Sequence, residues 1–437
     1  MPSAKGGKAA SKAKEAEPAG KLKKAESAYA PLLKTGLQAT ATRVEEVHLA
    51  IASKTFDTLK RVPGPPVPTR LVQGVHDAIS QGVYAAVRQG GSALLSMAGL
   101  AERMASDPNR LPKGRELAIR NALNGVFGDA LAEAGSPLAM TMGFHFNGAP
   151  LPVTPDALAA LGERVCLFIH GLACDEQCWV APADAWAISP WASSLAGGER
   201  PQYGSLLRRE LGISPLYLRY NTGLSIADNA HQLAAQLEQL VRYAPPRLRE
   251  LVLVGHSMGG LVARSAVHYG RQAGLAWPAQ LSDLIFLGTP HHGAPLERAG
   301  NWVDLVLGAT PYAAPFARLG KVRSAGITDL RHGNLVTEDW FGRDRFTRSA
   351  DRRQPVPLPD GIRCHAVASS IGAQSGDIKD RLLGDGLVPL DSALGRHADP
   401  RRRLAFTEAQ QWVGYRINHL ELLNHPEVYA QLKRWLA

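Results

Sequence analysis

The sequence predicts an α/β fold with a mostly parallel central sheet, preceded by a helical N-terminal region and a disordered basic tail. From Arg164 onwards, short apolar runs alternate with helical patterns, which is typical of parallel strands joined by right-handed crossovers. Residues 28–145 have mainly helical periodicity instead. Residues 1–27 are mostly Lys, Ala, Gly and Glu and cannot bury enough apolar surface to order. We therefore expect three parts: a tail over 1–27, a helical region over 28–145 and an α/β domain over 146–437.

The helical region is divided by a proline-rich segment. Residues 28–60 have helical periodicity, and the stiff connector 62–68 ends it. A second helix from Leu71 to Val87 has an apolar stripe at i+4 spacing, which we expect to pack on another helix or on the α/β domain. Contact of this stripe with a membrane surface or a lipid granule is the alternative. A further helix is predicted over 115–134, and 136–155 should be extended, with Thr141–Phe146 as a short edge hairpin.

The α/β domain is predicted from its apolar periodicity. In chain order, we expect strand Val165–Ile169, helix Pro201–Leu211, strand Leu216–Tyr220, helix Asp228–Tyr243, strand Leu251–Val254, a helix ending near Gly270, strands Leu284–Leu287, Arg363–Ala368 and Gln411–Arg416, and helix Glu427–Leu436. We place the start of the helix before Tyr243 at Asp228 or Asn229. Residues 308–359 contain no clear core strand, so 294–360 is a candidate lid insertion.

The charge of the chain is concentrated in short segments. The formal net charge is +10 and the isoelectric point is near 9.5. Seven lysines lie in the first 26 residues against three glutamates, and residues 343–353 form a second basic cluster. No nucleic-acid partner is expected, because interleaved aromatic residues and a reading helix are missing. The tail instead predicts reversible peripheral contact with an anionic membrane or lipid surface.

A cytoplasmic location is the expectation from the remaining sequence signals. The first 18 residues contain no apolar core of a signal peptide. The most apolar long window, 71–100, is interrupted by charged residues, so no transmembrane helix is expected. Four cysteines are too few for a disulfide framework, and reduced thiols are the default, although a Cys174–Cys178 disulfide remains open. This pair lacks a second ligand pair at metal-binding spacing, so no metal site is expected there.

The candidate nucleophile lies in the segment Leu251–Ala266. An apolar run suited to a buried strand leads into Gly255-x-Ser257-x-Gly259, and a helical pattern follows. This context predicts a strained turn that exposes the Ser257 hydroxyl at the edge of the sheet. Glycines at both flanking positions avoid side chains where strand and helix cross. Ser257 is therefore predicted to be a catalytic nucleophile.

A serine nucleophile needs a base, and the base needs an acid to orient it. With this type of turn, the acid and then the histidine follow in chain order. Asp385, between two glycines beyond the strand 363–368, is the predicted acid, with Asp391 as the alternative. Asp377 and Asp380 are less favoured.

The predicted base is His419, at the exit of the last strand. His425 is the alternative, but it precedes a proline and is typical of a residue leading into a helix. His419 is preferred on position alone.

An oxyanion hole requires two backbone N–H groups. One should belong to Met258, directly after the nucleophile. The other should come from the loop after strand 165–169, with Leu172 preferred and Ala173 as the alternative. His170 and His256 are expected to support these loops, not to act in the chemistry.

Two further groups of residues lie near the expected site. His291-His292 suggests a metal pair, but no acid or cysteine stands at ligand spacing, so a lining or bracing role is favoured. Trp179, Trp186 and Trp191 either wall an apolar acyl pocket or are packing residues, and the sequence favours neither.

Over roughly residues 145–437 the chain resembles the α/β-hydrolase superfamily, and within it bacterial lipases and esterases of the GPI inositol-deacylase-like (PGAP-like) group. The resemblance implies Ser257 as nucleophile, Asp385 as acid and His419 as base, and it adds no cofactor. The motifs that carry it are Phe168-Ile169-His170-Gly171-Leu172, Gly255-His256-Ser257-Met258-Gly259-Gly260, Gly288-Thr289-Pro290-His291-His292-Gly293, Asp385-Gly386-Leu387-Val388-Pro389 and Asn418-His419-Leu420.

The predicted function is therefore carboxylic ester hydrolysis by a lipase- or esterase-like serine hydrolase acting on acyl esters, with lipids among them. Thioesters, amides and storage polyesters suit the same triad and remain open. The alternative from another class is a binding or scaffold protein that attaches to a membrane or polymer granule through its N-terminal region.

Overall fold

The computed structural model describes residues 114–182, 186, 189–191, 200–246, 248–294, 324–345, 350–374 and 384–437. The predictions for the tail and for the helical region before residue 114 lie outside the described residues. So do residues 295–323 of the candidate lid insertion, and the less favoured acids Asp377 and Asp380.

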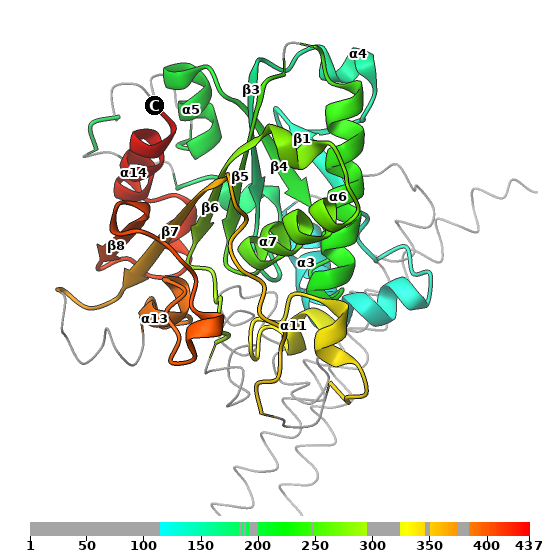
Figure 1. Ribbon diagram of the computed structural model, residues 1–437. Helices are drawn as coiled ribbons and strands as arrows, with labels where there is room; N and C mark the ends of the chain where they lie inside the picture. Colours follow the sequence, from blue (N-terminus) through cyan, green and yellow to red (C-terminus); the bar gives the residue numbers. More distant parts are fainter. Residues whose placement is uncertain are drawn as a thin grey trace, which may run out of the picture. The chain divides into compact units, whose positions relative to one another are not determined.

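The centre of the described structure is an eight-stranded sheet with the order β2-β1-β4-β3-β5-β6-β7-β8 (Figure 1). From β4 across to β8 every neighbouring pair is parallel, whereas β1 pairs antiparallel with both β2 and β4. The strands are β1 Gly143–Phe146, β2 Ala149–Leu151, β3 Arg164–Ile169, β4 Ser214–Arg219, β5 Glu250–His256, β6 Leu281–Leu287, β7 Arg363–Ser370 and β8 Gln411–Tyr415. The six strands predicted for the α/β domain are all present, with their ends shifted by a few residues.

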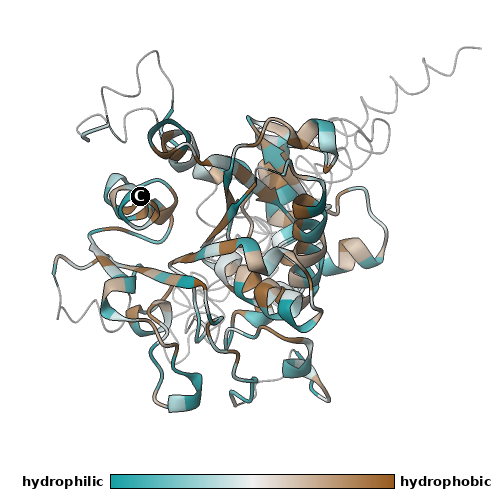
Figure 2. Ribbon diagram, turned by 45° about the horizontal axis from the view of Figure 1, so that its top comes forward, coloured by the Kyte–Doolittle hydropathy of each residue, from teal (hydrophilic) through white to brown (hydrophobic). Residues whose placement is uncertain are grey.

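Helices cover both faces of this sheet. Figure 1 shows α5 and α14 on one face and α6 and α7 on the other, and Figure 2 shows apolar strands between helices with polar outer faces. The shorter helices α11 and α13 lie near the carboxyl ends of the parallel strands. The α-helices are α3 Arg115–Glu133, α4 Pro155–Leu158, α5 Tyr203–Leu211, α6 Ile226–Tyr243, α7 Met258–Gln272, α11 Ala325–Asp329, α13 Leu390–Ala393 and α14 Pro426–Leu436. Short 3-10 helices are η1 Glu176–Trp179, η3 Trp277–Gln280, η4 Thr337–Trp340, η5 Pro400–Arg402, η6 Glu408–Gln410 and η7 Glu421–Leu423.

The core lies along the inner strands. Nearly every residue of β3, β5 and β6 is buried, as expected for parallel strands covered on both faces. The face under α5 and α14 adds a large aromatic cluster. Trp179 and Trp186 are fully buried in it, and Trp191 packs against it, so these tryptophans are packing residues.

Helix α6 begins earlier than predicted. It starts at Ile226, and Ser225 caps it by accepting a hydrogen bond from the Asp228 N–H at 3.0 Å. Asp228 is therefore not the cap but an acidic residue of the first turn. Its carboxylate also accepts a hydrogen bond from the Ser225 hydroxyl at 2.6 Å. The Ser-x-x-Asp spacing was the sequence signal for this start.

The predicted hairpin within Thr141–Phe146 was wrong in extent. The hairpin consists of β1 and β2, and the edge strand is β2. The turn is Asn147-Gly148, where both residues have positive φ, at 50° and 77°. Asn-Gly is the preferred two-residue hairpin turn because asparagine and glycine tolerate this backbone region. The predicted helix over 115–134 is confirmed as α3, one residue shorter.

The four cysteines, Cys166, Cys174, Cys178 and Cys364, are free. No helix in the described part of the chain combines the length and apolar character needed to cross a membrane.

Candidate active site

Ser257 lies at the junction of β5 and α7, in the strained turn that the sequence predicts. Its φ of 54° and ψ of −124° are rare for a residue with a side chain. The turn depends on the glycines beside it: a Cβ at Gly255 would lie 2.5 Å from the Gly260 Cα atom, and a Cβ at Gly259 would lie 2.3 Å from the Ile169 oxygen. The close crossing of strand and helix thus requires glycine at both positions.

The Ser257 side chain lies between two loops at the carboxyl ends of neighbouring strands. Its hydroxyl is buried and accepts or donates no hydrogen bond within the described structure. On one side, a Cβ added at Gly171, just after β3, would lie 3.0 Å from the Ser257 Cβ. On the other side, the Ser257 N–H donates to the Leu287 oxygen at the end of β6, at 2.8 Å. An unpartnered hydroxyl in this position is available to a bound molecule.

Asp385 and His419 form a buried hydrogen-bonded pair. Asp385 Oδ2 accepts from His419 Nδ1 at 2.7 Å, and Asp385 Oδ1 accepts from the N–H groups of Leu387 and Val388 at 3.0 and 2.8 Å. The His419 N–H also donates to the Asp385 carbonyl oxygen at 3.0 Å. A Cβ added at Gly288 would lie 3.1 Å from Asp385 Oδ2 and 3.2 Å from His419 Cε1. The pair therefore lies against Gly288. The residue before it, Leu287, accepts the hydrogen bond from the Ser257 N–H.

The alternative acid and base lie in different settings. The Asp391 side chain is 77% exposed and pairs with Arg396 at 3.5 Å. His425 is the N-cap of α14, where its Nδ1 accepts from the Glu427 N–H at 3.3 Å. Neither makes a hydrogen bond with a member of the Asp385–His419 pair among the contacts of the described residues.

The loop after β3 brings Gly171 against Ser257 and continues with Leu172 and Ala173. The Ala173 N–H donates to the Thr222 hydroxyl at 3.1 Å, so it is already engaged. Leu172, directly before it, is buried, and Met258 is the first residue of α7. N–H groups in the first turn of a helix have no partner within the helix and carry its positive dipole end. The arrangement favours Leu172 over Ala173 as the second donor.

His256 and His170 are buried supports of these loops. His256 Nε2 donates to the His419 carbonyl oxygen at 2.9 Å, and burial together with the nearby His419 ring lowers the pKa of His256 well below its usual range. His170 Nδ1 donates to the Gly171 oxygen at 2.9 Å, and burial lowers its pKa to about 4. Both rings are therefore neutral at neutral pH, and each fixes one loop of the site.

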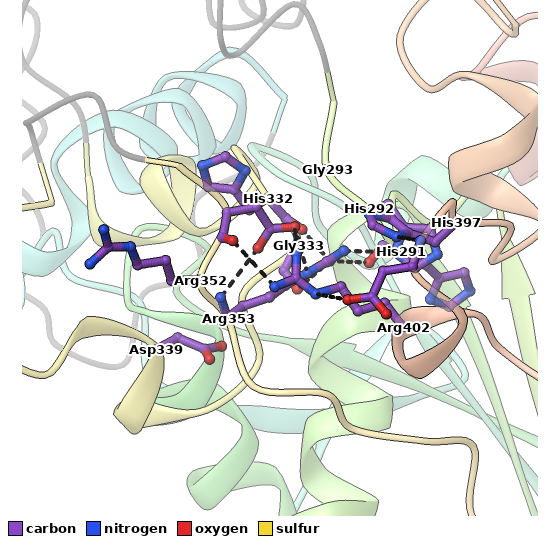
Figure 3. Close-up of polar contacts among 12 residues, drawn as sticks. His291, His292, Gly293, His332, Gly333, Asp339, Arg352, Arg353, His397 and Arg402 are labelled. Carbon is purple, nitrogen blue, oxygen red and sulfur yellow. Dashed lines mark hydrogen bonds and ion pairs between the residues drawn. The ribbon is translucent and has the colours of Figure 1, made fainter.

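His291 and His292 are held by two arginines. Arg264 donates to His291 Nδ1 at 3.0 Å. Arg353 donates to His292 Nδ1 at 2.7 Å, and both of these residues are labelled in Figure 3. Because a guanidinium only donates, each Nδ1 is unprotonated and each proton lies on Nε2. Burial, with the charge of Arg353, lowers the pKa of His292 to about 3, and burial lowers that of His291 far below its usual value. These contacts support the bracing role.

Arg353 is a bracing residue that the sequence did not indicate. Its buried guanidinium donates to the carbonyl oxygens of His291, His332 and Gly333, at the centre of Figure 3. It also lies 3.3 Å from Asp351, which pairs with Arg402. Arg353 thereby ties the end of the candidate lid insertion to the loop that follows β6. In the sequence it is one of several arginines of the basic cluster 343–353, and nothing there distinguishes it from its neighbours.

Helix α3 was also not expected at the site. Asn121 Nδ2 donates to Asp175 Oδ2 at 2.6 Å, three residues after Leu172. A Cβ at Gly125 would lie 3.0 Å from the Ala173 Cβ, so α3 lies directly against the loop after β3, which contains the predicted oxyanion donor. The only sequence signal for this contact is the spacing of small and amide residues along one face of the helix.

Among the described residues, no group of three His, Cys, Asp or Glu side chains is placed to hold a metal ion.

Residues 161–356 match the model of the PGAP1-like alpha/beta domain family. The match and the strand order confirm the predicted α/β-hydrolase fold and the resemblance to the PGAP-like group. A comparison with curated protein sequences found no match.

Solved structures with similar folds include three lipid- or ester-cleaving enzymes by name. Phospholipase PlaB from Legionella pneumophila is 18% identical, with 53% of this chain and 44% of that chain covered and a TM-score of 0.30. Staphylococcus hyicus lipase is 14% identical, with coverage of 64% and 96% and a TM-score of 0.35. Esterase B from Lactobacillus rhamnosis is 12% identical, with coverage of 80% and 96% and a TM-score of 0.34. The chain thus spans less than half of the phospholipase.

Proposed function

We propose that this α/β-hydrolase is a serine hydrolase that cleaves carboxylic esters, with Ser257 as nucleophile, His419 as base and Asp385 as acid. One observation carries the proposal. The Ser257 N–H, in the strained turn between strand and helix, donates to the Leu287 oxygen, and the next residue, Gly288, lies against a buried Asp385–His419 hydrogen bond of 2.7 Å. Serine hydrolysis uses these three groups, and in the α/β-hydrolase fold they follow in this chain order.

The protonation of His419 follows from its partner. The Asp385 carboxylate accepts hydrogen bonds from two backbone N–H groups, so it is oriented as an acceptor for His419 Nδ1–H as well. With its proton on Nδ1, His419 has an unprotonated Nε2 that can take the Ser257 proton. The serine oxygen then attacks the ester carbonyl carbon, and the imidazolium returns the proton to the departing alcohol. Water repeats the two steps on the acyl-enzyme and releases the acid.

Two backbone N–H groups, those of Leu172 and Met258, would bind the negative oxygen formed at each step. Leu172 precedes Ala173, whose N–H is held by Thr222, and Met258 is the first residue of α7, so both donors would belong to segments that are ordered before the reaction. The amino end of α7 adds its dipole at the same place. Donors of this kind typically contribute about 3–4 kcal/mol each to transition-state stabilisation.

The substrate class that we propose is acyl esters, including those of lipids. The resemblance to PGAP-like lipases and esterases supports an ester in general. Thioesters, amides and storage polyesters would be cleaved by the same groups, and a scaffold protein on a membrane or granule is the competing hypothesis. Activity on p-nitrophenyl esters of increasing chain length, with matched thioesters and amides, separates these cases.

The test is Ser257→Ala, compared with Ser265→Ala on the same helix. Ser265 is a buried serine whose hydroxyl donates to the Leu335 oxygen. We expect Ser257→Ala to lower kcat by at least about four orders of magnitude, because the covalent intermediate cannot form. A fluorophosphonate probe should label the wild type and the Ser265 variant at Ser257 only. Undiminished ester turnover in Ser257→Ala would reject the serine-hydrolase mechanism, and an unlabelled, inactive wild type would favour the scaffold.

A further inference from the structure

A cavity lies between the β1–β2 hairpin, β4, η1 and α5. Its volume is about 530 Å³, and the described residues of its lining come from these four elements and the segments next to them. None of the five candidate active-site residues lines it. This volume is in the range of cavities that bind small molecules.

The floor of the cavity contains buried polar groups without hydrogen-bond partners. Tyr217 is 6% exposed, and the Tyr217 hydroxyl has no acceptor. His145 is 5% exposed, and its Nδ1 makes no hydrogen bond, since the nearest carboxylate oxygen, on Glu176, is 3.7 Å away. Burial lowers the pKa of His145, so the ring is neutral, and burial raises the pKa of Tyr217, so the phenol keeps its proton. A buried polar group without a partner typically costs about 1–3 kcal/mol, which a bound ligand can recover.

The charges of the cavity are unevenly distributed. Glu176 is the only acidic side chain among the described residues of the lining, and Arg219 neutralises it through a two-pronged hydrogen bond. At the rim, α5 presents Arg208 and Arg209, which are both exposed. Arg208 donates to Asn147 Oδ1 at 3.1 Å and lies over the Phe146 ring at 5.3 Å. A positioned cationic rim thus stands above a floor of uncharged polar groups.

We propose that this cavity binds a small phosphomonoester, with its phosphate at Arg208 and Arg209 and its uncharged polar groups at Tyr217 and His145. Guanidinium forks bind phosphate oxygens in pairs, and a phosphomonoester offers three oxygens to two arginines, whereas one carboxylate offers two. The polar lining does not suit an acyl chain. The same phosphate chemistry occurs in a soluble metabolite and in a lipid headgroup, so the test has an arm for each.

The test titrates the full chain with glycerol 3-phosphate and adenosine monophosphate by calorimetry at low salt, with citrate for comparison. Vesicles containing phosphatidic acid are the headgroup arm. We expect saturable binding of at least one soluble phosphomonoester, weakened about tenfold or more in the double variant Arg208→Gln/Arg209→Gln. Raising the salt concentration should weaken binding as well. Tyr217→Phe keeps the ring stacked on Phe168 at 5.2 Å, and it should weaken binding several-fold without unfolding the protein.

The matched control is Arg242→Gln on α6, an exposed arginine on the opposite face of the sheet. It should bind the probe as the wild type does, and thermal unfolding should show that all variants are folded. Equal weakening in the control, unchanged binding in Tyr217→Phe and in the arginine double variant, or absence of binding by both phosphomonoesters and by the phosphatidic acid vesicles would overturn the proposal. Binding of citrate alone would overturn the phosphate assignment. Binding to vesicles without binding to either soluble probe would replace the metabolite with a lipid headgroup.

Discussion

The two sides of Ser257 are held in different ways. On the acid–base side, Asp385 is fixed by Leu387 and Val388, two and three residues further along the chain, and His419 binds Asp385 through both its ring and its backbone. On the oxyanion side, the loop after β3 is fixed from a distance. Asn121 of α3 reaches Asp175 across 54 residues of sequence, and Thr222 holds Ala173 across 49.

Because of this difference, the two groups of loops should differ in how strongly a distant substitution changes their geometry. The acid–base loops contain most of their own hydrogen bonds, so their geometry depends mainly on short segments after β7 and β8. The oxyanion loop depends on α3, which lies outside the segment 161–356 that matches the PGAP1-like family model. A change in α3 should therefore disturb the oxyanion donors while leaving the Asp385–His419 pair in place.

The largest effect is expected on the acid–base side. Asp385→Asn keeps the shape of the residue but removes the carboxylate that orients His419, and His419→Ala removes the base. We expect each to lower kcat by about three to four orders of magnitude with a modest change in stability. Steady-state kinetics on a short-chain p-nitrophenyl ester and thermal unfolding measure the two quantities.

Asp391→Asn and His425→Ala are the matched controls, since they change the same residue types a few positions away. Both should keep activity within a few-fold of the wild type. A crippling effect of either control, with Asp385 and His419 dispensable, would move the acid or the base to the other residue.

The same difference explains what the sequence predicts and what it does not. Ser257, Asp385 and His419 each follow a strand and stand beside glycines or turn residues, so spacing and chain order were enough to propose them. Asn121 and Arg353 lie in segments without such a motif, and their contacts depend on how distant parts of the chain pack. Side-chain volume and hydrogen-bond geometry decide these contacts, and neither is visible in periodicity. The β1–β2 hairpin is a different case. Its Asn147-Gly148 turn signal is visible in the sequence, but the predicted hairpin, Thr141–Phe146, ended before this turn.

An intermediate effect is expected on the oxyanion side. Gly128 lies in α3, and in an isolated helix the change Gly128→Ala would stabilise the helix by about 1 kcal/mol. Here the added Cβ would lie 1.9 Å from Asn221 Oδ1 and 3.0 Å from the Gly223 Cα atom, which flank Thr222. We expect kcat to fall about ten- to a hundredfold while KM changes little, because the loss falls on transition-state binding. Stability should fall by about 1–3 kcal/mol.

Gly143→Ala is the control for this variant, since a Cβ there meets no atom within 4 Å. It should leave kcat and the unfolding midpoint close to those of the wild type. Fluorophosphonate labelling of Gly128→Ala reports whether Ser257 and His419 are still assembled. Wild-type kcat in Gly128→Ala would show that the oxyanion loop does not depend on α3.

The smallest effect on activity is expected at the amino ends of the parallel strands, opposite the candidate site, where Asp283 of β6 forms a buried cluster. The carboxylate is fully buried and accepts from Arg363 at 2.6 and 2.8 Å and from His365 at 3.1 Å. Burial alone would raise the pKa of Asp283, but the hydrogen bonds from His365, Arg363 and Ser282 outweigh it and lower the pKa to about 2. Asp283 lies near the start of β6, whereas Gly288 and the candidate site lie beyond its end.

The sign of the pH dependence follows from this shift. The pKa of Asp283 is lower in the folded state than the ordinary 3.8, so its stabilising contribution is present above about pH 4 and is lost as the pH falls towards about 2. A shift of this size corresponds to about 2 kcal/mol. We expect Asp283→Asn to lower the free energy of unfolding by about that amount at pH 7, with the difference from the wild type constant down to pH 5 and narrowing below pH 4. Urea unfolding at a series of pH values measures this difference in stability. Ester turnover at pH 7 should stay within about twofold of the wild type, because Asp283 lies at the end of β6 that is away from Ser257. A stability difference that does not narrow below pH 4 would show that Asp283 acts through packing and not through its charge. A large loss of turnover would show that the Asp283 cluster and the candidate site, at opposite ends of the strands, are coupled.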